Sequence, residues 1–242
     1  AAGQQTGHPV RPPPLEGLRA VLFDLDGTLV DTASEFVVVV QALRAEYGLP
    51  PLEAALIAAS VSNGARALVT LALGTQETEP HFETQRQRLL TLYGEVLGST
   101  AQPYPGIPAL LAALAERGIA WGVSTNKPRA FAAPLMERLA IQPTIGSLVC
   151  PDDVRERKPH PEALLRNCAE LGCLPEQAIY IGDHLRDIEA GRRAGMYTVA
   201  ALYGYIEAGD NPTLWGADAS VRHSEDLAPL LLGTPYPLEE RT

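Results

Sequence analysis

The sequence predicts an α/β fold with a mostly parallel sheet and a helical insert. Short apolar stretches without polar alternation recur along the chain, and helical patterns separate most of them. Strands of this kind are typical of parallel sheets that helices cover on both faces. The predicted strands span residues 20–23, 119–124, 147–150, 178–181 and 198–202. With 242 residues and 46% hydrophobic content, the chain can bury the core of one large domain plus an insert.

The first predicted strand ends in a pair of carboxylates, Asp24 and Asp26, followed at once by Gly27. In open α/β sheets ligands bind at the carboxyl end of the strands, and glycine lets the backbone turn sharply there. Two acids so close repel unless a cation lies between them, and hard oxygen ligands favour Mg²⁺. Taken alone, an Asp-Gly pair after a strand is much more often an ordinary turn.

Residues 32–102 interrupt the strand pattern with a segment rich in helix-favouring residues. Apolar side chains at Phe36, Val40, Leu43 and Tyr47 have helical spacing, and glycine and proline clusters divide the segment into three or four helices. A polar turn runs from Ser62 to Arg66 inside the insert. It is a candidate substrate-reading loop or simply a linker between two helices.

Further polar clusters follow the later predicted strands. They contain Thr125 and Asn126, Lys158, and Asp183 with Asp187. Each could be an ordinary cap or turn. Because the carboxyl ends of parallel strands meet at one edge of the sheet, we expect these clusters to share a pocket with the first acid pair.

The complete string from Asp24 to Thr32, Asp-x-Asp-Gly-Thr-x-x-Asp-Thr, resembles the first motif of the haloacid dehalogenase-like (HAD) superfamily. The later clusters resemble its other three motifs in the same order. The resemblance implies a three-layer, Rossmann-like core with a small α-helical cap inserted after the first motif. The core would span residues 19–31 and 103–235 and the cap residues 32–102, with a flexible leader at 1–18 and a tail at 236–242.

Longer strings at residues 121–128, 203–206, 210–212 and 215–218 resemble the phosphoglycolate-phosphatase-like enzymes, and within them the N-acetylmuramic acid 6-phosphate phosphatases of peptidoglycan recycling. This resemblance implies a Mg²⁺-dependent phosphomonoesterase for a small carboxylated phosphate ester. Phosphoglycolate is the alternative substrate. A sugar phosphomutase and a non-catalytic phosphate-ligand sensor are further alternatives.

The resemblance also implies a role for each matching residue. Asp24 is the expected nucleophile, and Asp26 the acid and base that serves the leaving group and then the water. The side chains of Asp24 and Asp183, with the main-chain carbonyl of Asp26, are expected to hold Mg²⁺. The presence of Asp26 favours phosphoryl transfer over dehalogenation, which needs no leaving-group acid.

Around this centre, Thr125, the amide of Asn126 and Lys158 are expected to bind the phosphoryl group. Asp187 is expected to orient a metal-bound water or Lys158.

Residues of the insert are expected to bind the leaving group of the substrate. The candidates for this role are Asn63, Gly64 and Arg66, and Arg66 could bind a substrate carboxylate. Lys127 and Arg129 are alternatives for that carboxylate.

One residue departs from the family pattern. His184 stands where relatives often carry Asp or a small residue, so it could weaken the metal, add a cation near the substrate or serve as a helix cap.

The composition bounds the partners. A formal charge of −10 makes nucleic acid and anionic membranes poor partners, so a small phosphorylated substrate is expected instead. No apolar run was expected to approach the length of a membrane span. Cys150, Cys168 and Cys173 lack zinc-site spacing and are expected to be free thiols in the cytoplasm. The chain is expected to be a monomer or a homodimer.

Overall fold

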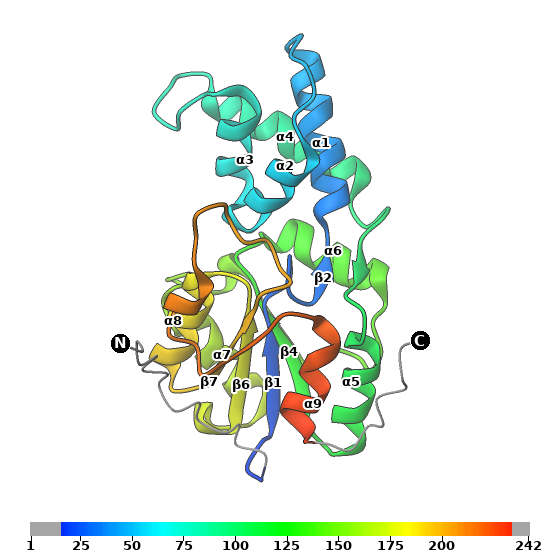
Figure 1. The fold of residues 1–242 in the computed structure, drawn as a ribbon, viewed down its shortest axis with the longest axis vertical. Helices are drawn as coiled ribbons and strands as arrows, with labels where there is room; N and C mark the ends of the chain where they lie inside the picture. The colour runs from blue at the N-terminus through cyan, green and yellow to red at the C-terminus, as the bar shows by residue number, and fades with distance from the viewer. Residues whose placement is uncertain (1–15, 234–242) are drawn as a thin grey trace, which may run out of the picture.

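A six-stranded parallel sheet runs through the computed structural model, which describes residues 16–233 (Figure 1). Its order is β5-β4-β1-β6-β7-β8, with every pairing parallel. The strands are β1 (Ala20–Phe23), β4 (Ala120–Ser124), β5 (Ser147–Val149), β6 (Ala178–Gly182), β7 (Tyr197–Ala201) and β8 (Ala219–Val221). The prediction of an α/β fold with a mostly parallel sheet is confirmed. It missed β8, which has only three residues and one buried side chain, and therefore no apolar run.

The central strand shows why its sequence does not alternate. Ala20 and Leu22 pack in one cluster with residues of α7 and α8, whereas Val21 and Phe23 pack in another with residues of α5 and α6. Both faces of β1 are thus covered by helices. These are α5 (Ile107–Glu116), α6 (Arg129–Leu139), α7 (Glu162–Leu171) and α8 (Leu185–Ala194), and α9 (Leu227–Leu232) follows at the C-terminal end.

Helix α7 places an amide in the core and a leucine outside it. Leu165 is 43% exposed. Asn167 takes the inward position instead, where its amide donates to the main-chain oxygen of Val123 at 3.0 Å and to Ser147 Oγ at 2.9 Å. An amide in the core is tolerated because these hydrogen bonds replace those it loses to water.

The insert consists of helices packed above the carboxyl ends of the central strands (Figure 1). They are α1 (Ala33–Glu46), α2 (Ala54–Ser60), a 3₁₀ turn (Val61–Asn63), α3 (Gly64–Leu73) and α4 (Phe82–Val96). By length and composition, the helical run Ala54–Leu73 could cross a membrane, so the expectation that no apolar run reaches that length is wrong. The 3₁₀ turn and Gly64, at φ +84°, interrupt this run, and α2 and α3 pack against α1.

Two chain segments connect the insert to the sheet. They pair as a short antiparallel ribbon of β2 (Val30–Asp31) and β3 (Gln102–Pro103). The first segment is held by Tyr205, which follows β7. Its Oη accepts hydrogen bonds from the main-chain N–H groups of Thr32 and Ala33, at 2.8 and 2.9 Å. It thereby satisfies donors at the start of α1, which has no side-chain cap of its own.

On the second segment, the buried carboxylate of Glu35 accepts main-chain hydrogen bonds from Gly98, Thr100 and Ala101, at 2.9, 2.9 and 2.5 Å.

Near the start of the described residues, Leu18 is buried in the core although the leader was expected to include it. The expected leader through residue 15 and the tail at 236–242 lie outside the described residues.

Replacing Glu35 tests how the second segment is held. Glu35→Ala removes the acceptor for three main-chain N–H groups, and we expect the free energy of unfolding to fall by about 3 kcal/mol. Urea titration followed by circular dichroism measures this. The matched control is Glu116→Ala at an exposed position of α5, where a change within about 0.5 kcal/mol is expected. Equal stability of the two variants would contradict this account.

Candidate active site

The polar clusters converge where the strand order reverses. From β1 the sheet grows toward β4 and β5 on one side and toward β6, β7 and β8 on the other. Such a switch point leaves a crevice at the carboxyl ends of the strands. Asp24 follows β1, Thr125 follows β4 and Asp183 follows β6, so three neighbouring strands deliver these side chains to that crevice.

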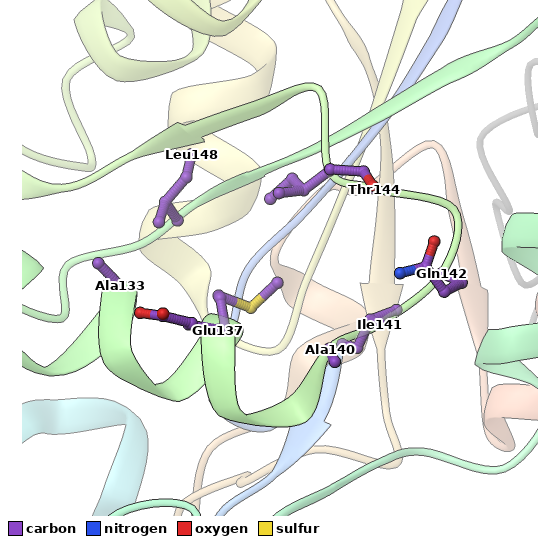
Figure 2. A pocket seen from close by; sticks show the side chains of 9 residues that line it. Ala133, Glu137, Ala140, Ile141, Gln142, Thr144 and Leu148 are labelled. Atoms are coloured by element: carbon purple, nitrogen blue, oxygen red, sulfur yellow. The ribbon is translucent and has the colours of Figure 1, made fainter.

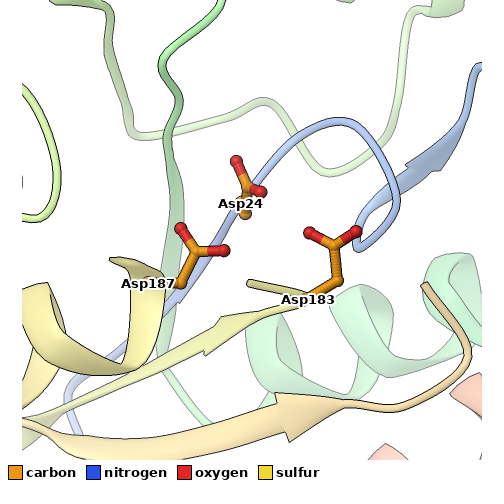
Figure 3. A group of neighbouring side chains, drawn as sticks. All are labelled: Asp24, Asp183 and Asp187. Atoms are coloured by element: carbon orange, nitrogen blue, oxygen red, sulfur yellow. The ribbon is translucent and has the colours of Figure 1, made fainter. Parts of the chain in front are cut away.

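Three buried carboxylates form the centre of the site (Figure 3). Ligand atoms of Asp24, Asp183 and Asp187 lie within 4.8 Å of one another. Burial, aided by the charge of Asp187, raises the pKa of Asp24 well above its ordinary value and that of Asp183 to about 6. The cluster therefore carries more negative charge than its surroundings balance, which is the environment of a cation site.

Lys158 supplies the positive charge nearest to these acids. Its ammonium lies 2.7 Å from Asp187 Oδ1 and 3.1 Å from Asp24 Oδ1, and its side chain is 1% exposed. Burial favours the neutral amine, but the two carboxylates outweigh this effect and raise the pKa of Lys158. Burial also disfavours ionisation of Asp187, yet Lys158 and Arg186 outweigh it and lower the Asp187 pKa.

Tyr180 belongs to the same network, and the sequence reasoning missed it. Its hydroxyl lies 2.6 Å from the ammonium of Lys158, 3.1 Å from Asp187 Oδ1 and 2.9 Å from the main-chain oxygen of Ser124. The available signal was a polar-tipped side chain inside an otherwise apolar strand. Tyr180 thus helps to fix the direction of Lys158.

The oxygen donors are of the kind that Mg²⁺ prefers. Two of the expected ligands, the side chains of Asp24 and Asp183, lie in the buried cluster. Ser62 of the insert donates to Asp183 Oδ2 at 2.7 Å and lies 3.5 Å from the main-chain oxygen of Asp26. One hydroxyl therefore approaches both Asp183 and the carbonyl expected as the third ligand, which shows that these two oxygens face a common space.

Two glycines allow the motifs to approach this closely. Gly27 adopts φ +83°, and a Cβ there would lie 2.2 Å from Asp183 Oδ2. A Cβ on Gly204 would lie 2.3 Å from the Cβ of Asp183 and 2.4 Å from the main-chain oxygen of Gly27. Real Cβ atoms do not come this close, so the packing around Asp183 requires glycine at both positions.

Asp26 has partners that the sequence reasoning did not assign to it. Its Oδ1 accepts from Thr32 Oγ1 at 2.7 Å and from the ammonium of Lys127 at 3.0 Å. Lys127 also donates to Tyr93 Oη at 2.5 Å, and its ammonium lies 4.9 Å from the centre of the Phe36 ring. Residues of the insert therefore help to hold the lysine that orients Asp26.

The expected phosphate-binding residues lie beside the acids. Thr125 is buried, and its Oγ1 accepts from the main-chain N–H of Lys127 at 3.0 Å, which leaves the hydroxyl hydrogen available for another partner. The side chain of Asn126 donates to the main-chain oxygen of Lys158 at 3.1 Å. This bond ties the loop after β4 to the loop that carries Lys158.

The polar turn of the insert reaches the core. Asn63 donates to Glu207, and its Oδ1 lies 3.1 Å from His184 Nε2. His184 is the N-cap of α8, since its Nδ1 accepts from the main-chain N–H of Arg186 at 3.2 Å. Burial and the charge of Arg186 lower the His184 pKa, which disfavours the second-cation alternative. The structure places His184 at the cap of α8, one of the roles expected for it.

A cavity of about 530 Å³ joins the insert to the acid cluster. Its basic lining residues outnumber its two acids, Asp24 and Asp26, although the whole chain has a formal charge of −10. Asn63, Gly64 and Arg66 line it, as expected of the polar turn, whereas Arg129 pairs with Asp153 outside the lining. The basic residues are Arg66, Arg86, Lys127, Arg157, Lys158 and Arg186. Arg86, Arg157 and Arg186 were not foreseen.

A second cavity, of about 320 Å³, lies beside α6 (Figure 2). Most of its lining is apolar or small, from Ala133 to Leu148, and Glu137 is its one ionisable side chain. It offers no set of convergent polar groups, so the cavity above the sheet is the better candidate for chemistry.

Comparison with known proteins agrees with this geometry. The family model for "Haloacid dehalogenase-like hydrolase" matches residues 21–201. An N-acetylmuramic acid 6-phosphate phosphatase from Pseudomonas aeruginosa is 50% identical over 214 residues, which cover 88% of this chain and 95% of the relative. A phosphoglycolate phosphatase from Xanthomonas campestris pv. campestris is 39% identical over 209 residues, covering 86% and 94% of the two chains.

The solved structures show the same architecture. The crystal structure described as a predicted phosphoglycolate phosphatase from Haemophilus somnus superposes with a TM-score of 0.77 at 27% identity. The match covers 87% of this chain and 96% of that one.

Gly204→Ala tests the close packing around Asp183. The added Cβ must displace Asp183, so we expect the free energy of unfolding to fall by about 1–3 kcal/mol and Mg²⁺ affinity to weaken by about tenfold or more. Chemical denaturation and titration calorimetry measure these. Gly94→Ala is the control, because nothing lies within 4 Å of its added Cβ and its affinity should be unchanged. Equal affinity of Gly204→Ala would contradict the packing argument, and absence of Mg²⁺ binding to the unmodified protein would refute the proposed metal site.

Proposed function

This chain belongs to the haloacid dehalogenase-like hydrolase family and is a phosphatase, and we propose that it acts on a small carboxylated phosphate monoester. N-acetylmuramic acid 6-phosphate is the first candidate, which would give the protein a role in peptidoglycan recycling. The observation that carries this choice is 50% identity to a phosphatase named for that substrate, over nearly the whole length of both chains. The cationic cavity supports it, because the substrate carries two acidic groups.

In the proposed first step, a carboxylate oxygen of Asp24 attacks phosphorus in line with the leaving oxygen. The ester P–O bond breaks as the Asp24–phosphorus bond forms. Asp26, in its protonated form, gives its proton to the leaving alkoxide, so the alcohol departs neutral. Lys127 and Thr32 hold Asp26 Oδ1 and thereby fix the orientation of this carboxyl group.

In the second step a water molecule attacks the phosphoryl group on Asp24. Asp26, now ionised, takes the proton from that water. The bond between phosphorus and Asp24 breaks, which releases inorganic phosphate and restores both carboxyl groups. The same residue thus serves as acid and then as base.

The charge of the transferring group is balanced from several directions in this proposal. Lys158 offsets it as a buried cation, while Thr125 and the main-chain amide of Asn126 donate hydrogen bonds. Asp187 holds Lys158 in place through its 2.7 Å contact. Mg²⁺, held by Asp24, Asp183 and the carbonyl of Asp26, would draw negative charge from the phosphoryl oxygens.

We further propose that residues 32–102 act as a cap over the described part of the predicted core, residues 19–31 and 103–233. Its contacts through Ser62 and Asn63 hold the polar turn against the acid cluster, so water is excluded while the substrate is bound. Arg66 and the turn from Asn63 to Gly64 are the proposed contacts to the leaving group.

We place the protein in the cytoplasm, as a monomer or homodimer. It acts there on a small phosphorylated substrate and has no nucleic-acid or membrane partner. The three free cysteines support a reducing compartment. Neither a sugar phosphomutase nor a non-catalytic sensor is preferred. The family is that of hydrolases, and the relatives at 50% and 39% identity are named phosphatases.

Phosphoglycolate is the second candidate substrate, because several relatives are named for it. It shares with the first candidate a carboxylate and a phosphate, and differs in lacking the sugar ring. A cavity of about 530 Å³ has room for a sugar.

Asp24→Asn tests the nucleophile. The amide cannot form the acyl phosphate, so hydrolysis of p-nitrophenyl phosphate should fall below about one thousandth of the unmodified rate, with the fold intact by circular dichroism. Asp226→Asn, at an exposed position, is the control and should retain activity. Acid quenching during turnover, followed by peptide mass spectrometry, should find a phosphoryl group on Asp24. A phosphoryl group on another residue would refute the assignment.

A direct comparison of substrates tests the choice of ester. We expect kcat/KM for N-acetylmuramic acid 6-phosphate to exceed that for phosphoglycolate by about tenfold or more, because the cavity walls contact the sugar as well as the charges. Phosphate release measured under identical conditions gives both values. A preference for phosphoglycolate would make it the substrate in place of N-acetylmuramic acid 6-phosphate. Poor turnover of both esters would reject the proposed substrate class but not the proposed phosphatase mechanism.

A further inference from the structure

We propose that Arg186 binds the carboxylate of the substrate and so makes the protein selective for carboxylated phosphate esters. This inference rests on the proposed function and assigns one of its two anionic groups to a residue. Arg186 lies in the first turn of α8 and lines the cavity above the acid cluster.

Arg186 carries a buried donor without an acceptor. Among residues 16–233, no hydrogen-bond partner exists for its Nε, although that atom is buried. Guanidinium groups bind planar anions through parallel N–H bonds, and a buried N–H group is rarely left unpaired in a folded protein. A donor of this kind inside a substrate cavity is suited to an anion that arrives with the substrate.

The cavity's other buried or half-buried basic side chains already have partners. Lys158 is paired with Asp24 and Asp187, and Lys127 with Asp26. On the insert, Arg86 donates two hydrogen bonds to Glu83, at 2.9 and 2.7 Å.

Two exposed arginines also line the cavity. Arg66 lies 3.7 Å from Glu77, with more than half of each side chain exposed, and Arg157 is exposed as well. Water competes strongly for such groups, so they bind a carboxylate more weakly than a partly buried guanidinium does.

The position of Arg186 favours the carboxylate over the phosphoryl group. The start of α8 faces the insert, since His184 lies 3.1 Å from Asn63. The leaving group of the substrate must extend toward the insert, because the phosphoryl group is engaged by Asp24 at the end of β1. Arg186 lines the same cavity as Asp24 and as Asn63 of the insert, and its charge opposes the rise in the pKa of Asp24. Arg186 therefore belongs to the space that joins the reacting centre to the insert.

A pair of sugar phosphates that differ only in the lactyl ether, which carries the carboxylate, tests this assignment. N-acetylmuramic acid 6-phosphate carries a lactyl ether that N-acetylglucosamine 6-phosphate lacks. In the unmodified protein, we expect kcat/KM to favour the carboxylated ester by about 10- to 100-fold, as for a hydrogen bond to a charged group. Arg186→Met should bring this ratio close to one, chiefly by raising KM for the carboxylated ester. If phosphoglycolate is the better substrate, kcat/KM for phosphoglycolate is compared with that for ethyl phosphate, which has a methyl group in place of the carboxylate.

Two further variants separate recognition from folding. Arg186→Lys keeps the positive charge but lacks the planar fork, so an intermediate ratio is expected. Arg193→Met removes an arginine from the same helix, outside the cavity and 55% exposed, and should leave the ratio unchanged. Melting temperatures of all variants show whether the fold is retained. A structural defect would lower turnover of both esters together and leave their ratio intact.

The outcomes separate the two proposals. Failure of the proposed function appears in the unmodified protein, as turnover of p-nitrophenyl phosphate without any preference for a carboxylated ester. That result also rejects the proposal that Arg186 binds a substrate carboxylate. If the preference is present and Arg186→Met retains it, the inference on Arg186 is overturned and the proposed function stands. Equal loss on both esters leaves their ratio intact and so overturns the inference too. If the melting temperature is unchanged, that result assigns Arg186 to the phosphoryl group.

Discussion

Crowding of negative charge at the end of the central strands is the constraint on which the site depends. Asp24, Asp183 and Asp187 are buried within reach of one another, and the ammonium of Lys158 contacts only two of them. Removing charges from water is costly unless they are paired. The arrangement persists because Lys158 is held by Tyr180 and the main chain of Ser124 as well as by the acids. The remaining negative charge is what suits the centre to a divalent cation.

The same region is tied to the connections that lead into the insert. Tyr205 donates its main-chain N–H to Asp183 at 2.9 Å, and its hydroxyl contacts Asp31, Thr32 and Ala33. Tyr203 reaches the main-chain oxygen of Thr28 at 2.7 Å. A single loop after β7 therefore contacts the acid cluster, the turn after β1 and the start of α1. A movement of the insert about this connection would be transmitted to Asp183 through Tyr205.

Charge is distributed unevenly between the surface and the cavity. The chain carries a formal charge of −10, yet basic side chains predominate around the cavity. An anionic ester is repelled by the bulk surface and attracted at one place, so local charge determines where it binds. The insert contributes Arg66 and Arg86, and the core contributes Lys127, Arg157, Lys158 and Arg186. Both parts of the chain are thus needed to build the positive environment.

The sequence by itself determined the fold class, five of the six sheet strands and the convergence of the acids with Lys158 and Thr125, because apolar strands and the residues that follow them are local patterns. Only the tertiary structure revealed the partners of these groups: Tyr180 with Lys158, Lys127 with Asp26, Ser62 with Asp183, and the unpaired Nε of Arg186. These depend on distances between segments far apart in the chain. Likewise β8 and the inward turn of Asn167 are set by packing against neighbours, which no local pattern encodes.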